Sequence, residues 1–143
     1  MSRRRTLDRM SIPVDVADLA KALTDFGAGY LLTVASDGAV KVVTVEPTVQ
    51  DGAVVVVDAS KGTLANLAGN HRVTLVFPPP LPKGFTLLVD GTAEVVGDDV
   101  RVRPSGAVLH RPGSHADGPP PPRSAGEATD SCANDCAPIT STA

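Results

Sequence analysis

Apolar residues recur at helical spacing over residues 14–27, before the chain turns to continuous apolar runs. One helix face would carry Val16, Leu19, Ala20, Leu23 and Phe26. Asp15 can cap the start of this helix, and Gly27 can end it. The pattern therefore predicts one amphipathic helix near the start of the chain.

Six apolar runs then have the length and composition of strands. They cover residues 30–35, 40–46, 53–58, 73–77, 85–96 and 100–103. The pairs Asp37-Gly38 and Asp51-Gly52 favour tight hairpin turns, so we expect the first three strands to form a meander. Gly91 predicts a bulge or a close backbone approach within the fifth strand. The Pro-rich segment 78–84 lacks backbone donors and should bridge two strands at an edge.

A second, shorter helix is expected over residues 63–69, between the third and fourth strands. Leu64, Leu67 and Ala68 share one of its faces, and Asn70 is a suitable end. Tight turns between six strands favour closure of the sheet, because closure removes unpaired edges. The pattern therefore predicts a mainly β protein, a small antiparallel barrel with two or three short helices.

The composition divides the chain into three parts. Residues 1–13 form a basic N-terminus that we expect to be flexible, and residues 14–112 form one domain. Residues 113–143 are rich in Pro, Gly and Ser, with too few large apolar side chains to offset the entropy of ordering them. We therefore expect removal of the residues after Pro112 to leave the thermal midpoint nearly unchanged.

Charge and hydropathy exclude several classes of function. The 143 residues carry a net charge of −3, which provides no basic surface for a nucleic acid. The apolar runs are shorter than the about 20 residues of a membrane span. Residues 3–5 are Arg, but no apolar segment of a secretory signal follows them. We therefore expect a cytoplasmic protein that binds neither nucleic acid nor membrane.

The chain has no motif typical of a metal site or of a nucleophilic enzyme. His71, His110 and His115 lack metal-ligand spacing, and His71 suits the C-terminal end of a helix as a cation. The thiols of Cys132 and Cys136 are four residues apart, unlike the usual zinc pair; they are inert or redox-sensitive, or they complete a metal set with His110 and His115. We expect no metal, and a bound cofactor if the protein is an enzyme.

The best candidate site is the turn between the third strand and the second helix. A helix start presents free N–H groups and a partial positive charge, and Ser60, Lys61 and Thr63 add two hydroxyl groups and a cation. This combination would suit a phosphate, although neither a P-loop nor a G-x-G-x-x-G motif is present. The alternative is that Ser60 or Thr63 only caps the helix and that Lys61 is solvated.

Residues 14–111 resemble the pyridoxamine 5′-phosphate oxidase-like family of flavin-binding split barrels, in particular its small actinobacterial members. The most specific part of the resemblance is the pattern N-L-x-x-N-x-R-V-T-L, formed here by Asn66, Leu67, Asn70, Arg72, Val73, Thr74 and Leu75. The resemblance implies a six-stranded antiparallel split β-barrel. It also implies a homodimer that holds FMN or a deazaflavin at the subunit interface.

The resemblance further implies which residues form the site. The cofactor-binding candidates are Val43, Thr44, Val45, Ser60, Lys61, Thr63 and Asn66, with the backbone of residues 43–45 facing the isoalloxazine ring. Many relatives have a basic residue where Thr63 stands, so either Lys61 reaches the phosphate or the phosphate site is weaker. The cationic candidates for orienting a substrate are Lys41, Arg72 and Lys83.

The family name does not fix the activity. The oxidase has a C-terminal arginine motif that holds the pyridoxal ring, whereas no Arg follows Arg123 here, so pyridoxamine phosphate oxidation is not expected. We expect an FMN- or deazaflavin-dependent oxidoreductase, a reductase of a small molecule, with FMN favoured. The alternatives are a protein that binds or carries a flavin or haem without turnover, and a structural dimer that has lost its cofactor.

Overall fold

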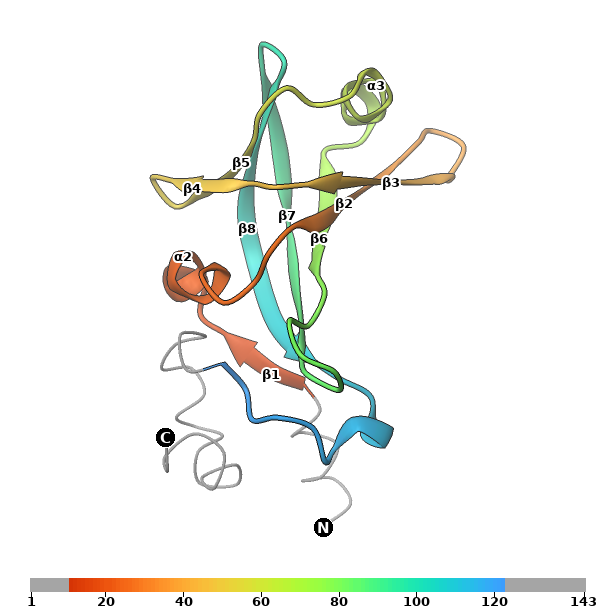
Figure 1. Cartoon of the computed structure of the whole chain (residues 1–143). Helices are drawn as coiled ribbons and strands as arrows, with labels where there is room; N and C mark the ends of the chain where they lie inside the picture. Colours follow the sequence, from red (N-terminus) through yellow and green to blue (C-terminus); the bar gives the residue numbers. More distant parts are fainter. Residues whose placement is uncertain (1–10, 123–143) are drawn as a thin grey trace.

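The computed structural model describes residues 11–122 (Figure 1). The predicted basic N-terminus up to residue 10 and the thiols of Cys132 and Cys136 lie outside the described residues. The elements are β1 (Ser11–Val14), η1 (Val16–Asp18), α2 (Leu19–Leu23), β2 (Gly29–Val34), β3 (Val40–Val45), β4 (Thr48–Gln50), β5 (Ala53–Val56), α3 (Lys61–Gly69), β6 (Arg72–Phe77), β7 (Thr86–Val96), β8 (Asp99–His110) and η2 (Gly113–His115).

The eight strands form one antiparallel sheet in the order β3-β2-β6-β7-β8-β5-β4, with β1 added to β8. The long strand β8 pairs along one edge with β7, and along its other edge first with β5 and then with β1. This arrangement is an antiparallel split barrel, so the predicted fold class is confirmed. The structure has eight strands instead of six, because β1 and the three-residue β4 are too short to give a clear apolar pattern.

The predicted meander of the first three strands is wrong. Asp37-Gly38 does join β2 to β3, but Asp51-Gly52 joins the short β4 to β5, with φ angles of 51° and 78°. β3 ends as an edge strand, and β5 pairs with β8 instead. A hairpin signal places a turn, but it does not say which strand lies on either side. All four residues of β5 are buried, which suits a strand held between two others.

The N-terminal helix is also shorter than predicted. Residues 11–14 form β1, which pairs with residues 107–110 of β8 and ends just before Asp15. Asp15 is a cap, because its carboxylate accepts a hydrogen bond of 3.0 Å from the Ala17 N–H, but the cap belongs to η1. The buried alanine of α2 is Ala22 and not Ala20. Helical structure thus covers residues 16–23, as η1 followed by α2, and ends before Phe26.

The prediction for Gly91 is confirmed. The register of β7 against β8 shifts between Asp90 and Gly91, which marks a bulge. A Cβ atom at Gly91 would lie 2.5 Å from the Arg103 carbonyl oxygen, so the backbones also approach closely there. β8 continues past the predicted residues 100–103 as far as His110.

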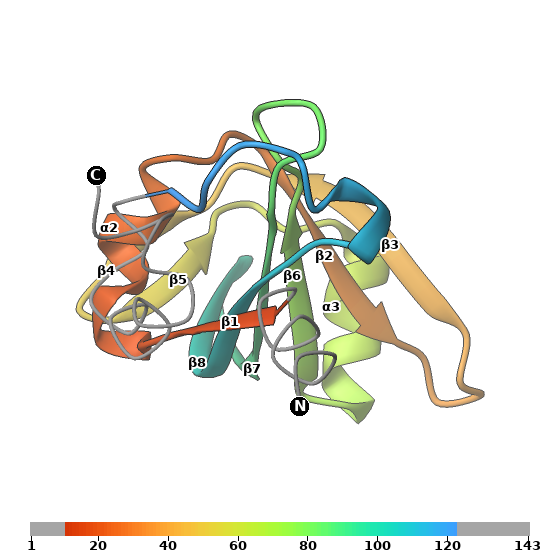
Figure 2. The same ribbon diagram turned by 90° about the horizontal axis from the view of Figure 1, so that it is seen from below.

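The core lies on the inner face of the sheet, where both helices contribute to it. Leu19 of α2 and Leu67 of α3 belong to the same cluster as the inward-facing strand residues Leu31, Leu75 and Leu87. In Figure 2, α2 lies to the left and α3 to the right of β6, β7 and β8. Within residues 11–122, no helix is long and apolar enough to cross a bilayer.

Residues 112–122 run back over the β6–β7 loop. The buried Arg111 donates a hydrogen bond of 2.7 Å to the Pro119 carbonyl, and its guanidinium lies 4.0 Å from the centre of the Phe85 ring. Lys83 forms an ion pair of 3.1 Å with Asp117. Burial lowers the pKa of Arg111, an effect partly opposed by the charge of Asp117. The predicted domain boundary at Pro112 stays a prediction, but this segment makes contacts that its composition did not suggest.

Candidate functional site

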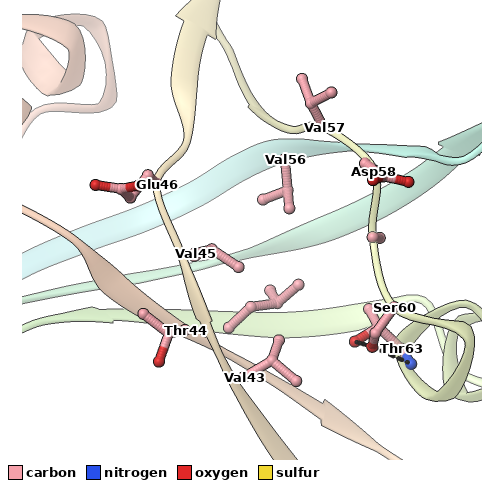
Figure 3. Close-up of a pocket in the computed structure, with 11 residues that line it drawn as sticks. Val43, Thr44, Val45, Glu46, Val56, Val57, Asp58, Ser60 and Thr63 are labelled. Atoms are coloured by element: carbon pink, nitrogen blue, oxygen red, sulfur yellow. Dashed lines mark hydrogen bonds between the residues drawn. The ribbon is translucent and has the colours of Figure 1, made fainter.

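A hollow of about 410 Å³ lies between β3 and the segment that leads from β5 into α3 (Figure 3). It is lined by Leu31, Val43, Thr44, Val45, Glu46, Val56, Val57, Asp58, Ala59, Ser60 and Thr63. The hairpin β2–β3 brings residues 43–46 to one side of the hollow. The end of β5, which pairs with β8, leads into the segment on its other side. The structure thus brings five of the seven predicted cofactor residues, namely Val43, Thr44, Val45, Ser60 and Thr63, to one hollow.

Two backbone donors in the first turn of α3 have no partner among residues 11–122. Ser60 is the N-cap: its Oγ accepts a hydrogen bond of 3.2 Å from the Thr63 N–H and donates one of 2.9 Å to the Thr63 Oγ1. The Leu64 N–H donates to the Ser60 carbonyl. The N–H groups of Lys61 and Gly62 are therefore the ones available to an anion. Thr63 is completely buried, so its hydroxyl serves the cap.

Lys41 brings a cation to the same turn from β3. A Cβ atom at Gly62 would lie 2.6 Å from the Lys41 Cε and 2.9 Å from its Nζ, so the lysine side chain lies across the glycine. Lys61 is the first residue of α3. Neither lysine forms a salt bridge with any residue between 11 and 122. Two lysines at a helix start with free N–H groups provide a favourable environment for an anion.

Asn66 has a different position from the one that the resemblance implied. Its Nδ2 donates a hydrogen bond of 3.0 Å to the Oγ1 of the buried Thr33 on β2. This bond fixes α3 against the strand that lies beside β3. Asn66 therefore orients the helix, and it does not line the hollow.

Two of the three predicted substrate residues lie elsewhere. Arg72 lines a separate hollow of about 760 Å³ on the outer face of the sheet, together with Thr74 and Asp90. Lys83 lies in the β6–β7 loop, paired with Asp117, and Figure 1 shows this loop at the opposite end of the molecule from α3. Only Lys41 is placed beside the candidate cofactor site.

Glu46 and Asp58 are the charged residues that line the hollow, and sequence reasoning missed both. Figure 3 shows them on opposite sides of it. Asp58 has a φ angle of 57°, and its N–H donates a hydrogen bond of 3.0 Å to the Asp99 carboxylate. This conformation of Asp58 depends on a turn 41 residues away. The only local signal for Asp58 in the sequence is an Asp that follows a run of valines.

The histidines do not gather into a metal site. His110 lies 3.1 Å, through its Nδ1, from the Ser11 hydroxyl where β8 meets β1. In the part of the chain from 11 to 122, no group of three or more His, Cys, Asp and Glu side chains is placed to hold a metal ion.

The chain is similar in sequence to two mycobacterial proteins. No family model matches it. The uncharacterized protein Mb0449c of Mycobacterium bovis is 37% identical over 134 residues, which cover 86% of this chain and 92% of the relative. The same values hold for the uncharacterized protein MT0457 of Mycobacterium tuberculosis.

Two solved structures share the fold at low sequence identity. An FAD-binding protein from Mesorhizobium loti superposes with a TM-score of 0.57 at 16% identity, covering 70% of this chain and 96% of the other. An F420 reductase gives a TM-score of 0.51 at 19% identity, covering 60% and 92%. The chain therefore shares its split-barrel fold with these solved structures, and it belongs to the same family as the mycobacterial proteins Mb0449c and MT0457.

Proposed function

We propose that this protein binds a flavin, with the phosphate at the start of α3 and the ring against the backbone of Val43–Val45. The observation that carries the proposal is the position of Lys41 across Gly62, beside Lys61 and two free N–H groups. These groups would hold a phosphate through charge-assisted hydrogen bonds. Lys41 thus takes the role that a basic residue in place of Thr63 would have in many relatives.

The residues present fit a flavin mononucleotide. The apolar side chains of Val43, Val45 and Val56 offer a surface for a ring next to the cationic turn. When bound, the flavin would supply hydride transfer, and the protein would supply binding and orientation. We propose FMN as the cofactor and a small molecule as the substrate of a reductase. The structural similarity to an FAD-binding protein and to an F420 reductase supports the proposal of a flavin.

The absorption spectrum of the freshly purified protein tests the proposal directly. We expect the bands of an oxidised flavin, either as isolated or after addition of FMN. A deazaflavin spectrum would identify a deazaflavin as the cofactor in place of FMN. A haem spectrum would identify haem as the bound group and would support the carrier function instead. A colourless protein that binds none of the three would contradict both functions and would leave the structural dimer.

Gly62→Ala is expected to weaken FMN binding about tenfold. The added methyl group would occupy the place of the Lys41 Cε and displace its ammonium, which removes one charge-assisted contact. The fold should tolerate the change, because the displaced atoms are the end of a flexible side chain. Fluorescence titration with FMN, and with riboflavin, which lacks the phosphate, measures the effect.

Gly69→Ala is the matched control for this experiment. Gly69 ends the same helix, and a Cβ atom there would have no neighbour within 4 Å. Its FMN affinity should equal that of the wild type. Equal loss in both variants, or an equal loss of riboflavin binding in Gly62→Ala, would argue against a phosphate at this turn.

We also propose that two copies pair through the outer face of the sheet, the face turned away from the core. Cross-strand register places Tyr30, Val76, Leu88 and Val108 side by side on this face. Val42 on β3 is 55% exposed. Between residues 11 and 122 both α-helices pack into the core cluster on the other face, so this apolar surface lacks a cover. Such surfaces commonly form two-fold interfaces.

The outer face adjoins the proposed flavin site. Thr44 is the cross-strand neighbour of Tyr30 on the outer face, and it also lines the hollow. A partner seated on this face would therefore lie at the edge of the site. Cofactor binding should then stabilise the dimer by linkage.

Sedimentation across a dilution series tests the homodimer. We expect Val42→Glu to raise the dimer dissociation constant about tenfold or more, because the carboxylate would be desolvated in the interface. Val96→Glu is the matched control, since Val96 is 53% exposed at the end of β7, far from β3 in the sheet order. A wild type that stays monomeric while fully loaded with flavin would refute the shared site.

A further inference from the structure

A second, smaller pocket of about 210 Å³ lies beside the β6–β7 loop, which Figure 1 shows at the opposite end of the molecule from α3. Its walls come from the α2–β2 connection, the β6–β7 loop and the segment after η2. Leu81 and Phe85 are among its apolar lining residues, and Asp25 is the one charged residue that lines it. The pocket therefore combines apolar walls with a single carboxylate.

The carboxylate of Asp25 is not fully satisfied by the protein. Its Oδ2 atom is buried and has no hydrogen-bond partner among residues 11–122. Lys21 lies one helical turn before Asp25 but forms no ion pair with it. Asp25 also follows Thr24, the C-cap of α2, and the end of a helix favours a cation over an anion. An unpartnered buried carboxylate oxygen costs free energy, so a contribution to folding does not explain Asp25.

The walls of the pocket offer few donors for this oxygen. Four lining residues are prolines, which have no backbone N–H: Pro80, Pro119, Pro120 and Pro122. Arg111 packs on the Phe85 ring, but its guanidinium donates to the carbonyls of Lys83 and Pro119. A trapped water molecule needs about two to four polar partners, which these walls do not provide. A donor that also brings an apolar body suits the pocket better than water does.

We infer that this pocket binds a small organic ammonium ion, whose charge pairs with Asp25 and whose apolar body packs against Phe85 and the prolines. The cation compensates the carboxylate, and its N–H group satisfies Oδ2 through a charge-assisted hydrogen bond. The pocket is smaller than the roughly 300–1,000 Å³ of most ligand sites, so it suits a short amine. This site is separate from the proposed flavin hollow, and the inference does not depend on the flavin.

Titrations of the full chain with 2-phenylethylammonium and with 2-phenylethanol test the inference. The two probes share an apolar body, and only the first is a cation at neutral pH. We expect the ammonium ion to bind about tenfold more tightly than the alcohol, because it alone forms a charge-assisted hydrogen bond with Asp25. NMR titration measures both dissociation constants, and the shifts of the Phe85 ring protons report whether the probes enter this pocket.

Asp25→Asn should bring the ratio of the two dissociation constants close to one, with the affinity for the alcohol unchanged. Without a probe, its urea midpoint should not fall, because Oδ2 has no partner to lose among residues 11–122. Asp37→Asn is the matched control, since it removes the same charge from the β2–β3 turn. Asp37 accepts a hydrogen bond of 3.0 Å from the Ala39 N–H, which an Asn can also accept. Its affinities for both probes should equal those of the wild type.

Four results would overturn the inference. They are an absence of binding, equal affinities of the wild type for the two probes, an unchanged ratio in Asp25→Asn, and a clear fall of the urea midpoint in that variant, which would assign Asp25 a structural role. Arg123 follows the lining residue Pro122 in the sequence, so Arg123→Ala is a further test. Binding of the ammonium ion by this variant but not by the wild type would make the chain itself the occupant and would also overturn the inference. None of these results bears on FMN binding.

Discussion

Replacing both Lys41 and Lys61 by Ala is expected to weaken FMN binding by roughly 10²–10⁴-fold. Each lysine would donate a charge-assisted hydrogen bond to the phosphate, and each such bond contributes about 1.5–3 kcal/mol. The two contributions need not add fully, because both cations act on one group. Fluorescence titration at fixed ionic strength measures the loss, and riboflavin should bind equally to variant and wild type.

A control variant separates the local charges from the net charge. Lys21→Ala combined with Arg103→Ala removes two cations from exposed positions on α2 and β8. Its FMN affinity should remain near the wild-type value. A similar loss in both double variants would show that long-range attraction, and not contact at α3, governs binding.

Truncation after Pro112 is expected to destabilise the domain by about 2–3 kcal/mol. The deletion removes the Pro119 carbonyl that accepts from Arg111 and the Asp117 carboxylate paired with Lys83. It would also expose Phe85, now 2% exposed, and burial of a Phe side chain contributes about 1.5–3 kcal/mol. Urea unfolding followed by circular dichroism measures the change. The composition alone predicts no change.

Truncation after Pro122 provides the comparison. It keeps the contacts that Arg111 and Lys83 make within residues 11–122 and removes only residues 123–143. The midpoint should match that of the full chain. Equal midpoints for the two truncations would restore the boundary at Pro112 that the sequence predicts.

Local signals predicted the parts of the fold that depend on neighbouring residues. Asp37-Gly38 marked a real hairpin, Gly91 marked a real bulge, and Ser60 capped a real helix. These features follow from backbone conformations that only a few residue types favour. The helical pattern after Asp15 is present as η1 and α2, whereas β1 was missed because its partners on β8 lie 93 to 99 residues away, which no local pattern contains.

The sequence by itself determined the fold class and the position of the candidate site on the chain, at Ser60 to Thr63. The tertiary structure decided which other groups surround it. Lys41 reaches Gly62 because the β2–β3 hairpin lies beside α3, and Asp58 meets Asp99 because β5 pairs with β8. The interaction between two charges depends on the distance between them. For charges on separate strands, that distance depends on pairings between residues far apart in sequence, so a local pattern does not predict it.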